Sequence, residues 1–258
     1  MFEVSNQKTV NISKELANEE FVIFANVQVE FNIEDIDETF NLNFFVEEGA
    51  KVSIKMLSLK HKKTLNLKAN VCKNGLFLIN IADFVSENIE VNSNVILYGD
   101  NSKSEVNLSS LVNKNYCKKY NISFSHIGEN TNSNLKGYGV SQDEGNLIIK
   151  GISHIEKGSI KSKANQIAKI ILFDKASKAS ASPILKIDYD DIKANHGCAI
   201  GALNQEHLYY LLSRGLSLFE AKRIITEGYL LPIAKYFNSD EEQLIKETIE
   251  GSIKNDWC

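Results

Sequence analysis

The sequence lacks several features that would assign it to a common functional class. Its 258 residues carry a formal net charge of −4 and no clear stripe of Lys and Arg, which excludes a general nucleic-acid binder that must neutralise phosphates. No run of about 18 apolar residues is present, which excludes a membrane-spanning helix. The N-terminus also lacks the basic region, apolar core and cleavage site of a signal peptide, and we therefore expect a cytoplasmic protein.

Cysteine is scarce, and its spacing indicates neither a zinc knuckle nor a disulfide framework. Cys72, Cys117, Cys198 and Cys258 form no Cys-x-x-Cys pair and have no histidine at clamp spacing. We expect them to be free thiols. A Gly-x-x-x-x-Gly-Lys-Ser/Thr loop is also missing, so the chain itself should not bind ATP in the manner of P-loop proteins.

Between about residues 20 and 193 the sequence is a succession of short strand candidates. Apolar residues make up 43% of the chain, which is enough for a sizeable core. In segments such as FVIFANVQVEF and NVILYGD they are often β-branched or aromatic and alternate with polar residues. Clusters of Asn, Gly, Asp and Ser separate the segments, and no amphipathic helix lies between them. The pattern is all-β and argues against a parallel α/β sheet with crossover helices.

Two architectures fit this pattern, a β-sandwich and a stacked β-solenoid. Asn recurs in KNGLF, VNSNV and GDNSKSEVN, which we interpret as segment ends, and stacked turns accept Asn in the left-handed conformation. This placement favours the solenoid, although the sequence shows no strict repeat. We predict a mainly β protein with a right-handed β-helix (solenoid)-like core over residues 1–203.

After residue 203 the apolar period becomes helical. The segment NQEHLYYLLSRG has leucines on one helical face, and Gly215 is a natural C-terminal end. A second helix is predicted to begin at the capping box SLFE, residues 217–220, and a third at the box SDEE, residues 239–242. The prediction for residues 204–258 is therefore a short C-terminal α-helical region.

The segment IDYDDIKANHGCAIGALNQEHLYYLLSRGLSLFEAKRII resembles the C-terminal signature of the SufB/SufD family of iron–sulfur cluster assembly scaffolds. In that signature, two acidic residues and a strand precede a His-Gly motif, and a helix with a Tyr-Leu-x-Ser-Arg-Gly pattern follows. The segment SHIGENTNSNLKGYGVSQDEGNLIIKGISHIEKGSIKSKANQ is also similar to the family, so the resemblance covers about residues 112–237. NHGCAIG is more like SufD than SufB, because SufB has His-Glu-Ala there.

The resemblance implies a role for His196, which matches the histidine that SufD contributes across its interface with SufB. A neutral imidazole suits borderline iron, and a strand end positions it well; the alternative is a histidine that only hydrogen-bonds near the strand–helix junction. Cys198 stands where SufD proteins usually have Ala. If residues 195–199 continue a strand, both side chains lie on one face, and we name both as metal ligands. The alternative for Cys198 is a small buried hydrophobe.

Other polar residues near these two have their own interpretations. Asp190 and Asp191 are either acceptors that orient His196 or exposed charges at a strand edge. His126 and His154 lie in strand-rich segments, and we interpret both as structural rather than catalytic.

The resemblance also implies partners. In the family the helical tail binds the SufC ATPase, an ABC-type protein, while the β-helices of SufB and SufD pair with each other. Aromatic residues and Arg are enriched at interfaces. We predict that the ATPase contacts Tyr209, Tyr210, Arg214, Gly215, Leu218 and Ala221. The alternative is that the apolar stripe of these helices packs back on the solenoid.

The implied function is that of a non-catalytic SufD-like subunit, which helps a SufB-like subunit and the ATPase to build and transfer clusters. No tightly bound cofactor is expected, only a transient iron–sulfur cluster at the subunit interface. A first alternative is a self-pairing, homodimeric minimal scaffold, because family members begin with a helical domain and this sequence starts almost directly with strands. A second is a β-solenoid enzyme acting on polysaccharide, which needs paired carboxylates and would use Asp188, Asp190 and Asp191.

Overall fold

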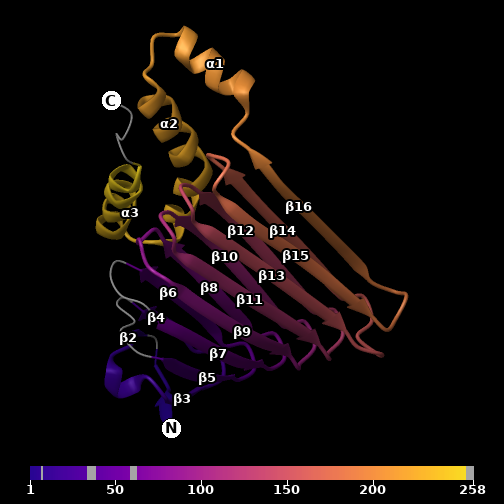
Figure 1. The fold of residues 1–258 in the computed structure, drawn as a ribbon. Coiled ribbons are helices and arrows are strands. Elements are labelled where there is room, and N and C mark those ends of the chain that lie inside the picture. Colours follow the sequence, from indigo (N-terminus) through magenta and orange to yellow (C-terminus); the bar gives the residue numbers. More distant parts are fainter. Residues whose placement is uncertain (7, 34–38, 59–62, 254–258) are drawn as a thin grey trace.

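The computed structural model describes residues 1–6, 8–33, 39–58 and 63–253. Within these residues the chain forms two eight-stranded parallel sheets, and successive strands alternate between the sheets (Figure 1). Each strand therefore pairs with the strand two places earlier in the chain, which is the topology of a β-solenoid. The predicted mainly β fold with a solenoid core and C-terminal helices is confirmed.

We call the two sheets A and B. In spatial order, sheet A contains β1 (Phe2–Val4), β3 (Glu20–Ile23), β5 (Phe40–Val46), β7 (Lys63–Val71), β9 (Ile89–Leu97), β11 (Cys117–His126), β13 (Asn146–Ile155) and β15 (Lys178–Ile187). Sheet B contains β2 (Lys8–Asn11), β4 (Gln28–Ile33), β6 (Lys51–Ser58), β8 (Leu76–Asp83), β10 (Lys103–Val112), β12 (Asn132–Ser141), β14 (Lys163–Leu172) and β16 (Lys193–Ala202).

The core lies between the sheets, because alternate side chains of each strand point inward. In β5 and β9 every second residue is buried, as the pleat requires. Near the N-terminus the interior is aromatic, and the rings of Phe21 and Phe44 stack with centroids 5.2 Å apart. Toward the C-terminal end, polar side chains also enter the interior, and Lys118, His126 and Gln166 are all buried there.

Some of the asparagines expected in turns lie there, and others lie inside a strand. Asn74 and Asn101, in KNGLF and GDNSKSEVN, have φ angles of 57° and 59°, the left-handed conformation that Asn tolerates better than most residues. The interpretation of VNSNV as a segment end is wrong. Asn92 and Asn94 lie inside β9, because Asn92 has partners on the neighbouring strands.

Asn92 belongs to an asparagine ladder along sheet A. Each Nδ2 donates to the Oδ1 of the preceding member at 2.7 to 2.9 Å. The members are Asn18, Asn41, Asn66, Asn92 and Asn121. An amide both donates and accepts, so asparagines stacked on successive turns of the solenoid satisfy each other. Asn18 precedes β3, and the other four members lie on strands of sheet A. Their spacings of 23, 25, 26 and 29 residues follow the solenoid period, which drifts and so produces no strict repeat.

Replacing Asn92 by Ala breaks this ladder in the middle. Asn121 then loses its acceptor and Asn66 its donor, and we expect the free energy of unfolding to fall by about 1–2 kcal/mol. Urea unfolding followed by circular dichroism measures the change. Asn132→Ala is the control, because Asn132 is exposed on β12 and its side chain has no hydrogen bond among the described residues. An equal loss in both variants would contradict a stabilising role for the ladder.

Short helices flank the solenoid. A 3₁₀ helix, η1 (Lys14–Leu16), precedes β3. After β16 come α1 (Gln205–Ser213), α2 (Leu218–Leu230), the 3₁₀ helix η2 (Leu231–Tyr236) and α3 (Ser239–Ser252). None of these helices, within the described part of the chain, has the length and apolar character that a membrane crossing requires.

One predicted capping box is confirmed and the other is displaced. In α2, Ser217 Oγ accepts from the Glu220 amide while the Glu220 carboxylate accepts from the Ser217 amide. The capping box predicted at residues 239–242 lies one position earlier, at residues 238–241. Asn238 is the N-cap of α3 and Glu241 completes the box, because the Asn238 amide oxygen accepts two of the free N–H groups at the helix start.

The helices do not cover the molecule evenly. Side chains of α3 and η2, among them Ile233, Ile245 and Ile249, pack in a second apolar cluster with Phe84 and Leu111 of the solenoid. In contrast, α1 has no buried residue, and Figure 1 shows it projecting beyond the C-terminal end of β16. The helical region therefore has one part fixed to the solenoid and one part that reaches away from it.

Candidate functional site at the open end of the solenoid

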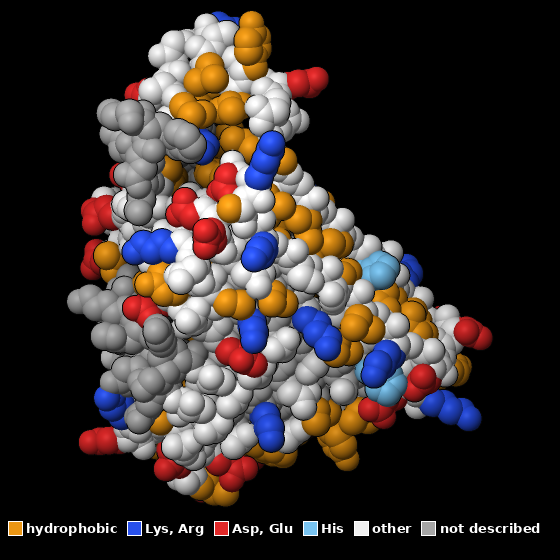
Figure 2. Space-filling view, in the orientation of Figure 1, with side chains coloured by type: hydrophobic (Ala, Val, Ile, Leu, Met, Phe, Trp, Pro, Cys, Tyr) orange, Lys and Arg blue, Asp and Glu red, His pale blue; other side chains and the backbone are white. Residues whose placement is uncertain are grey.

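The last turn of the solenoid, formed by β15 and β16, is open. Each of these strands ends its sheet and is paired on one side only within the described chain. Their inward-facing residues align with buried residues of β13 and β14 but are themselves exposed or half-exposed. They are Ala179, Ala181, Pro183, Leu185 and Ile187 of β15, and Ala194, His196, Cys198 and Ile200 of β16. In Figure 2, hydrophobic side chains gather along the edge where Figure 1 places these strands.

His196 and Cys198 lie side by side on this open face. His196 Nδ1 is 3.2 Å from the carbonyl oxygen of Pro183, and Cys198 Sγ is 3.7 Å from that of Ala181. A carbonyl oxygen only accepts, so Nδ1 carries the proton in this contact, and Nε2 keeps its lone pair for a metal or a donor. Both side chains are exposed. One imidazole nitrogen and one thiol are therefore accessible on the open face of β15 and β16.

The acidic residues before β16 do not orient this pair. Of the two interpretations of Asp190 and Asp191, the structure supports exposed charges, because both aspartates are exposed and the Pro183 carbonyl is the partner of His196. Asp188 is engaged elsewhere, accepting from His154 Nε2 at 2.7 Å. No group of three or more His, Cys, Asp or Glu residues with metal-binding geometry occurs in the described residues. His196 and Cys198 therefore place one nitrogen and one sulfur atom on this face, which is fewer than a metal site needs.

Gln166 lies directly behind the open face, and sequence reasoning missed it. It pairs in register with His196 and is buried, with Nε2 donating to Ser153 Oγ at 2.7 Å and to the Ile184 carbonyl at 3.2 Å. Adjacent carbonyls of β15 thus hold Gln166 and His196. A Cβ on Gly151 would lie 2.7 Å from Gln166 Oε1, so glycine there makes room for the amide. The sequence signal for Gln166 was its position in the strand pattern, because it alternates with Ala164 and Ala168 on the inward face of β14.

His126 lies deeper in the interior and is fully buried. Its Nδ1 and Nε2 are 2.7 and 2.8 Å from the hydroxyls of Thr131 and Ser133. Burial, together with the nearby His154, lowers the pKa of His126 to about 4. These contacts use both ring nitrogens, which supports the structural interpretation of this histidine.

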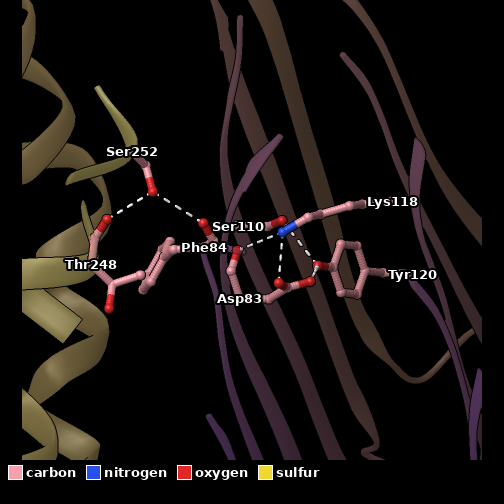
Figure 3. Close-up of polar contacts among 7 residues, drawn as sticks. All are labelled: Asp83, Phe84, Ser110, Lys118, Tyr120, Thr248 and Ser252. Atoms are coloured by element: carbon pink, nitrogen blue, oxygen red, sulfur yellow. Dashed lines mark hydrogen bonds and ion pairs between the residues drawn. The ribbon is translucent and has the colours of Figure 1, made fainter. Parts of the chain in front are cut away.

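A buried charge cluster forms a second polar centre (Figure 3). Asp83 of β8 accepts from Lys118 Nζ at 2.6 Å and from the Tyr120 hydroxyl, and both partners come from β11 of the opposite sheet. Because the single Tyr120 proton goes to Asp83, Ser110 donates to the Tyr120 oxygen, at 2.9 Å. Burial lowers the pKa of Lys118, which Asp83 opposes, and burial and Asp83 together raise the pKa of Tyr120.

This cluster lies next to the attachment of α3. The residue after Asp83 is Phe84, whose carbonyl accepts from Ser252 Oγ at 3.1 Å, and the Ser252 carbonyl in turn accepts from Gln142 Nε2 at 2.8 Å. The end of α3 is thus bound to two turns of the solenoid wall. Figure 3 shows the contact between Ser252 and Phe84 beside the buried ion pair. The cluster contains no metal-binding set and is sealed from solvent, so we assign it to stability.

The helix residues named from the sequence fall into two groups. On α1, Tyr209 and Tyr210 are 74% and 56% exposed, and the Arg214 guanidinium lies 5.1 Å from the Tyr210 ring centroid. Gly215 follows the helix with a φ of 90°, a left-handed ending that favours glycine. The remaining two residues are less accessible: Leu218 is half-buried and Ala221 is fully buried, so Ala221 is not part of an accessible surface.

These features define a β-solenoid protein with an open last turn, on which an imidazole and a thiol are exposed, and with an attached helical arm. Open strand edges and exposed apolar surfaces are suited to assembly with other chains. The chain belongs to the SufBD family, because residues 18–229 match the family described as "SUF system FeS cluster assembly, SufBD core domain". The family resemblance read from the sequence is therefore confirmed.

Individual relatives support the assignment. The iron–sulfur cluster assembly protein SufD of Bacillus subtilis is 31% identical over 181 residues, which are 69% of this chain and 40% of that protein. SufBD family proteins of Staphylococcus saprophyticus and Mycobacterium bovis are each 26% identical over 62% of this chain, covering 35% and 19% of their own lengths. The chain thus spans less than half the length of these relatives. Within the SufBD family, it is similar to SufD.

Proposed function

We propose that the chain acts as a SufD-like scaffold subunit that pairs through its open solenoid end with a SufB-like subunit. The observation that carries this proposal is the last turn itself. Among the described residues, β15 and β16 have no strand partner on one side, and Ile187 and Ile200 are 44% and 39% exposed. An edge of this kind invites pairing with another chain, and a contiguous apolar surface marks an interaction site.

The iron–sulfur cluster is the cargo of this assembly rather than a resident cofactor. His196 Nε2 and the Cys198 thiolate supply one nitrogen and one sulfur ligand, and soft thiolates are the usual ligands of iron–sulfur clusters. Such clusters ordinarily take four protein ligands, so two come from this chain and the others from the partner subunit. Binding requires the thiol to release its proton, which an exposed Cys198 passes to solvent.

The helical arm is the proposed contact for a SufC-type ATPase. Tyr209, Tyr210 and Arg214 are exposed together on or beside α1, and residues of this kind dominate the energetics of many interfaces. Gly215 and Leu218 lie at the turn that follows. ATP hydrolysis belongs to the partner, and this chain transmits the resulting movement to the open end without catalysing a reaction itself.

Self-pairing is the second candidate, and Cys198 favours it. Because the thiol lies on the same face as His196, two copies that meet at their open ends would supply two imidazoles and two thiolates. A SufB-like subunit would then be unnecessary for the ligand set.

The test is the subunit composition of the chain after co-expression with SufB-like and SufC-type proteins of the same genome, measured by native mass spectrometry. A complex containing all three supports the first candidate, and a homodimer that retains the ATPase without SufB supports the second. A monomer that binds neither partner contradicts both candidates.

A matched pair of variants locates the contact at the open end. Ile200→Glu buries a charge in the pairing face and should weaken subunit pairing at least about a hundredfold. Asn195→Glu adds the same charge to the opposite face of β16 and should leave pairing unchanged.

The variants His196→Ala and Cys198→Ala test the two ligands. If the complex of each variant still forms, we expect it to hold less assembled cluster, measured by the visible absorption of the cluster. A full yield of cluster in both variants would show that neither residue is a ligand.

A further inference from the structure

A groove between sheet B and the helices has no part in the function proposed above. It has a volume of about 400 Å³, within the range of roughly 300 to 1,000 Å³ that small-molecule sites occupy. Its floor is the outer face of β10 and β12, and its wall is formed by α2 and η2. It is separate from the open end, where His196 and Cys198 lie.

Three tyrosines give the groove an aromatic lining, one each from β12, α2 and η2. The rings of Tyr138 and Tyr229 meet edge to face, with centroids 5.5 Å apart and planes at 85°. Tyr236 also lines the groove, and its hydroxyl donates to Glu105 at 3.4 Å. Burial raises the pKa of Tyr229, so its hydroxyl stays protonated. Rings in this arrangement favour a planar aromatic ligand, which stacks against one face and meets another edge-on.

The charges at the groove favour an anion. Lys136 pairs with Glu105 at 3.2 Å, so these two charges compensate each other. Lys235 lies on η2 with Nζ 4.8 Å from the Tyr236 ring centroid, and it has no carboxylate partner among the described residues. One positive charge at the rim is therefore uncompensated.

Two further residues indicate that the groove is built to stay open. Ser109 lies on the floor of the groove, where its side chain is only 3% exposed. Gly228 lies inside α2, where glycine is less favourable than alanine by about 1 kcal/mol. A Cβ built on Gly228 meets no atom within 4 Å, so packing does not require glycine there, and a larger side chain would occupy the groove.

We propose that this groove binds a small planar aromatic anion, that is, a ring system carrying a carboxylate, sulfonate or phosphate group. The rings lie against Tyr138 and Tyr229, the acidic group lies toward Lys235, and the hydroxyl of Ser109 hydrogen-bonds to a polar atom of the ligand. Such a ligand would also hold α2 and η2 against sheet B.

Two fluorescent probes test the proposal on the full chain. 1-Anilinonaphthalene-8-sulfonate is an anion with a planar naphthalene ring system, and N-phenyl-1-naphthylamine has the same rings without the sulfonate. We expect the anionic probe to bind at least about tenfold more tightly than the neutral one. Lys235→Gln should abolish this preference. Equal affinity of both probes for the unmodified chain would overturn the assignment of an anion.

A second pair of variants shows where the probe binds. Gly228→Leu fills the groove and should weaken binding of the anionic probe at least about tenfold. Gly251→Leu makes the same change at a glycine of α3 that also has open space around it and lies outside the groove lining, and it should bind as the unmodified chain does. Unchanged binding in a folded Gly228→Leu variant would place the probe elsewhere, for example on the open end, and refute the site. If Gly228→Leu does not fold, the Lys235→Gln result decides.

Discussion

An Asp83→Asn variant should lose about 3–5 kcal/mol of folding free energy, because it leaves the Lys118 ammonium in the core without its counter-charge. Both side chains are completely buried, and Lys118 Nζ lies 2.6 Å from Asp83 Oδ1. Lys118 also donates to the Asp83 carbonyl at 3.2 Å, but a neutral acceptor does not replace a charge. Urea unfolding at neutral pH measures the loss.

Two further variants separate the charge effect from the loss of a side chain. Asp83→Asn combined with Lys118→Met removes both charges and should recover most of the stability, because a buried apolar pair is often as stable as a buried ion pair. Glu48→Gln removes the partner of Lys73 in an exposed pair 4.0 Å long and should change stability by less than about 0.5 kcal/mol. If Asp83→Asn costs no more than Glu48→Gln, the buried pair does not stabilise the fold.

The ion pair should also influence the attachment of α3. Asp83 is followed by Phe84, whose carbonyl accepts from Ser252 near the end of α3, so a shift of the β8 end moves that acceptor. Hydrogen exchange in the last turns of α3 should therefore be faster in Asp83→Asn, and this effect should be larger than in Glu48→Gln.

The second large effect is a loss of stability on mild acidification, caused by His126. Its pKa is lowered from 6.5 to about 4 by burial and by the nearby His154. Between these values the unfolded chain takes up a proton on His126 and the folded chain does not, so stability falls as the pH falls. The shift corresponds to about 3 kcal/mol, present near neutral pH and lost progressively between about pH 6.5 and pH 4.

A His126→Gln variant tests this expectation. Glutamine can hydrogen-bond to Thr131 and Ser133 but does not titrate, so the dependence of unfolding free energy on pH should be flatter than in the unmodified chain over this interval. His207→Gln, at an exposed position of α1, should keep the original dependence. Parallel curves for the unmodified chain and His126→Gln would show that another group causes the acid sensitivity.

One part of the candidate site could be predicted from the sequence and another part could not. The motif around His196 and Cys198 predicts that both residues share a face if the strand continues, which follows from the two-residue period of a β-strand alone. The acceptor for His196 could not be predicted in this way. Pro183 lies on the opposite sheet, 13 residues earlier, and only the closure of the last turn brings its carbonyl to the imidazole.

The buried ion pair and the groove could not be predicted from the sequence. Lys118 occupies an inward position of β11, but a lysine in an alternating strand is ordinarily assigned to the solvent face. Its partner Asp83 is 35 residues away in the sequence, and the pairing depends on how many residues each turn contains. The groove joins residues of β10 and β12 to residues of α2 and η2, which no local pattern connects.

The sequence by itself determined the properties that neighbouring residues encode. Alternating apolar residues produced the strands, the change to a helical period produced the C-terminal helices, and the motif near residue 196 identified the family. The tertiary structure decided the register of the asparagine ladder, the burial of Lys118, the open last turn and the groove. These depend on contacts between residues that are distant in the sequence, and such contacts are fixed only when the successive turns of the solenoid stack on one another.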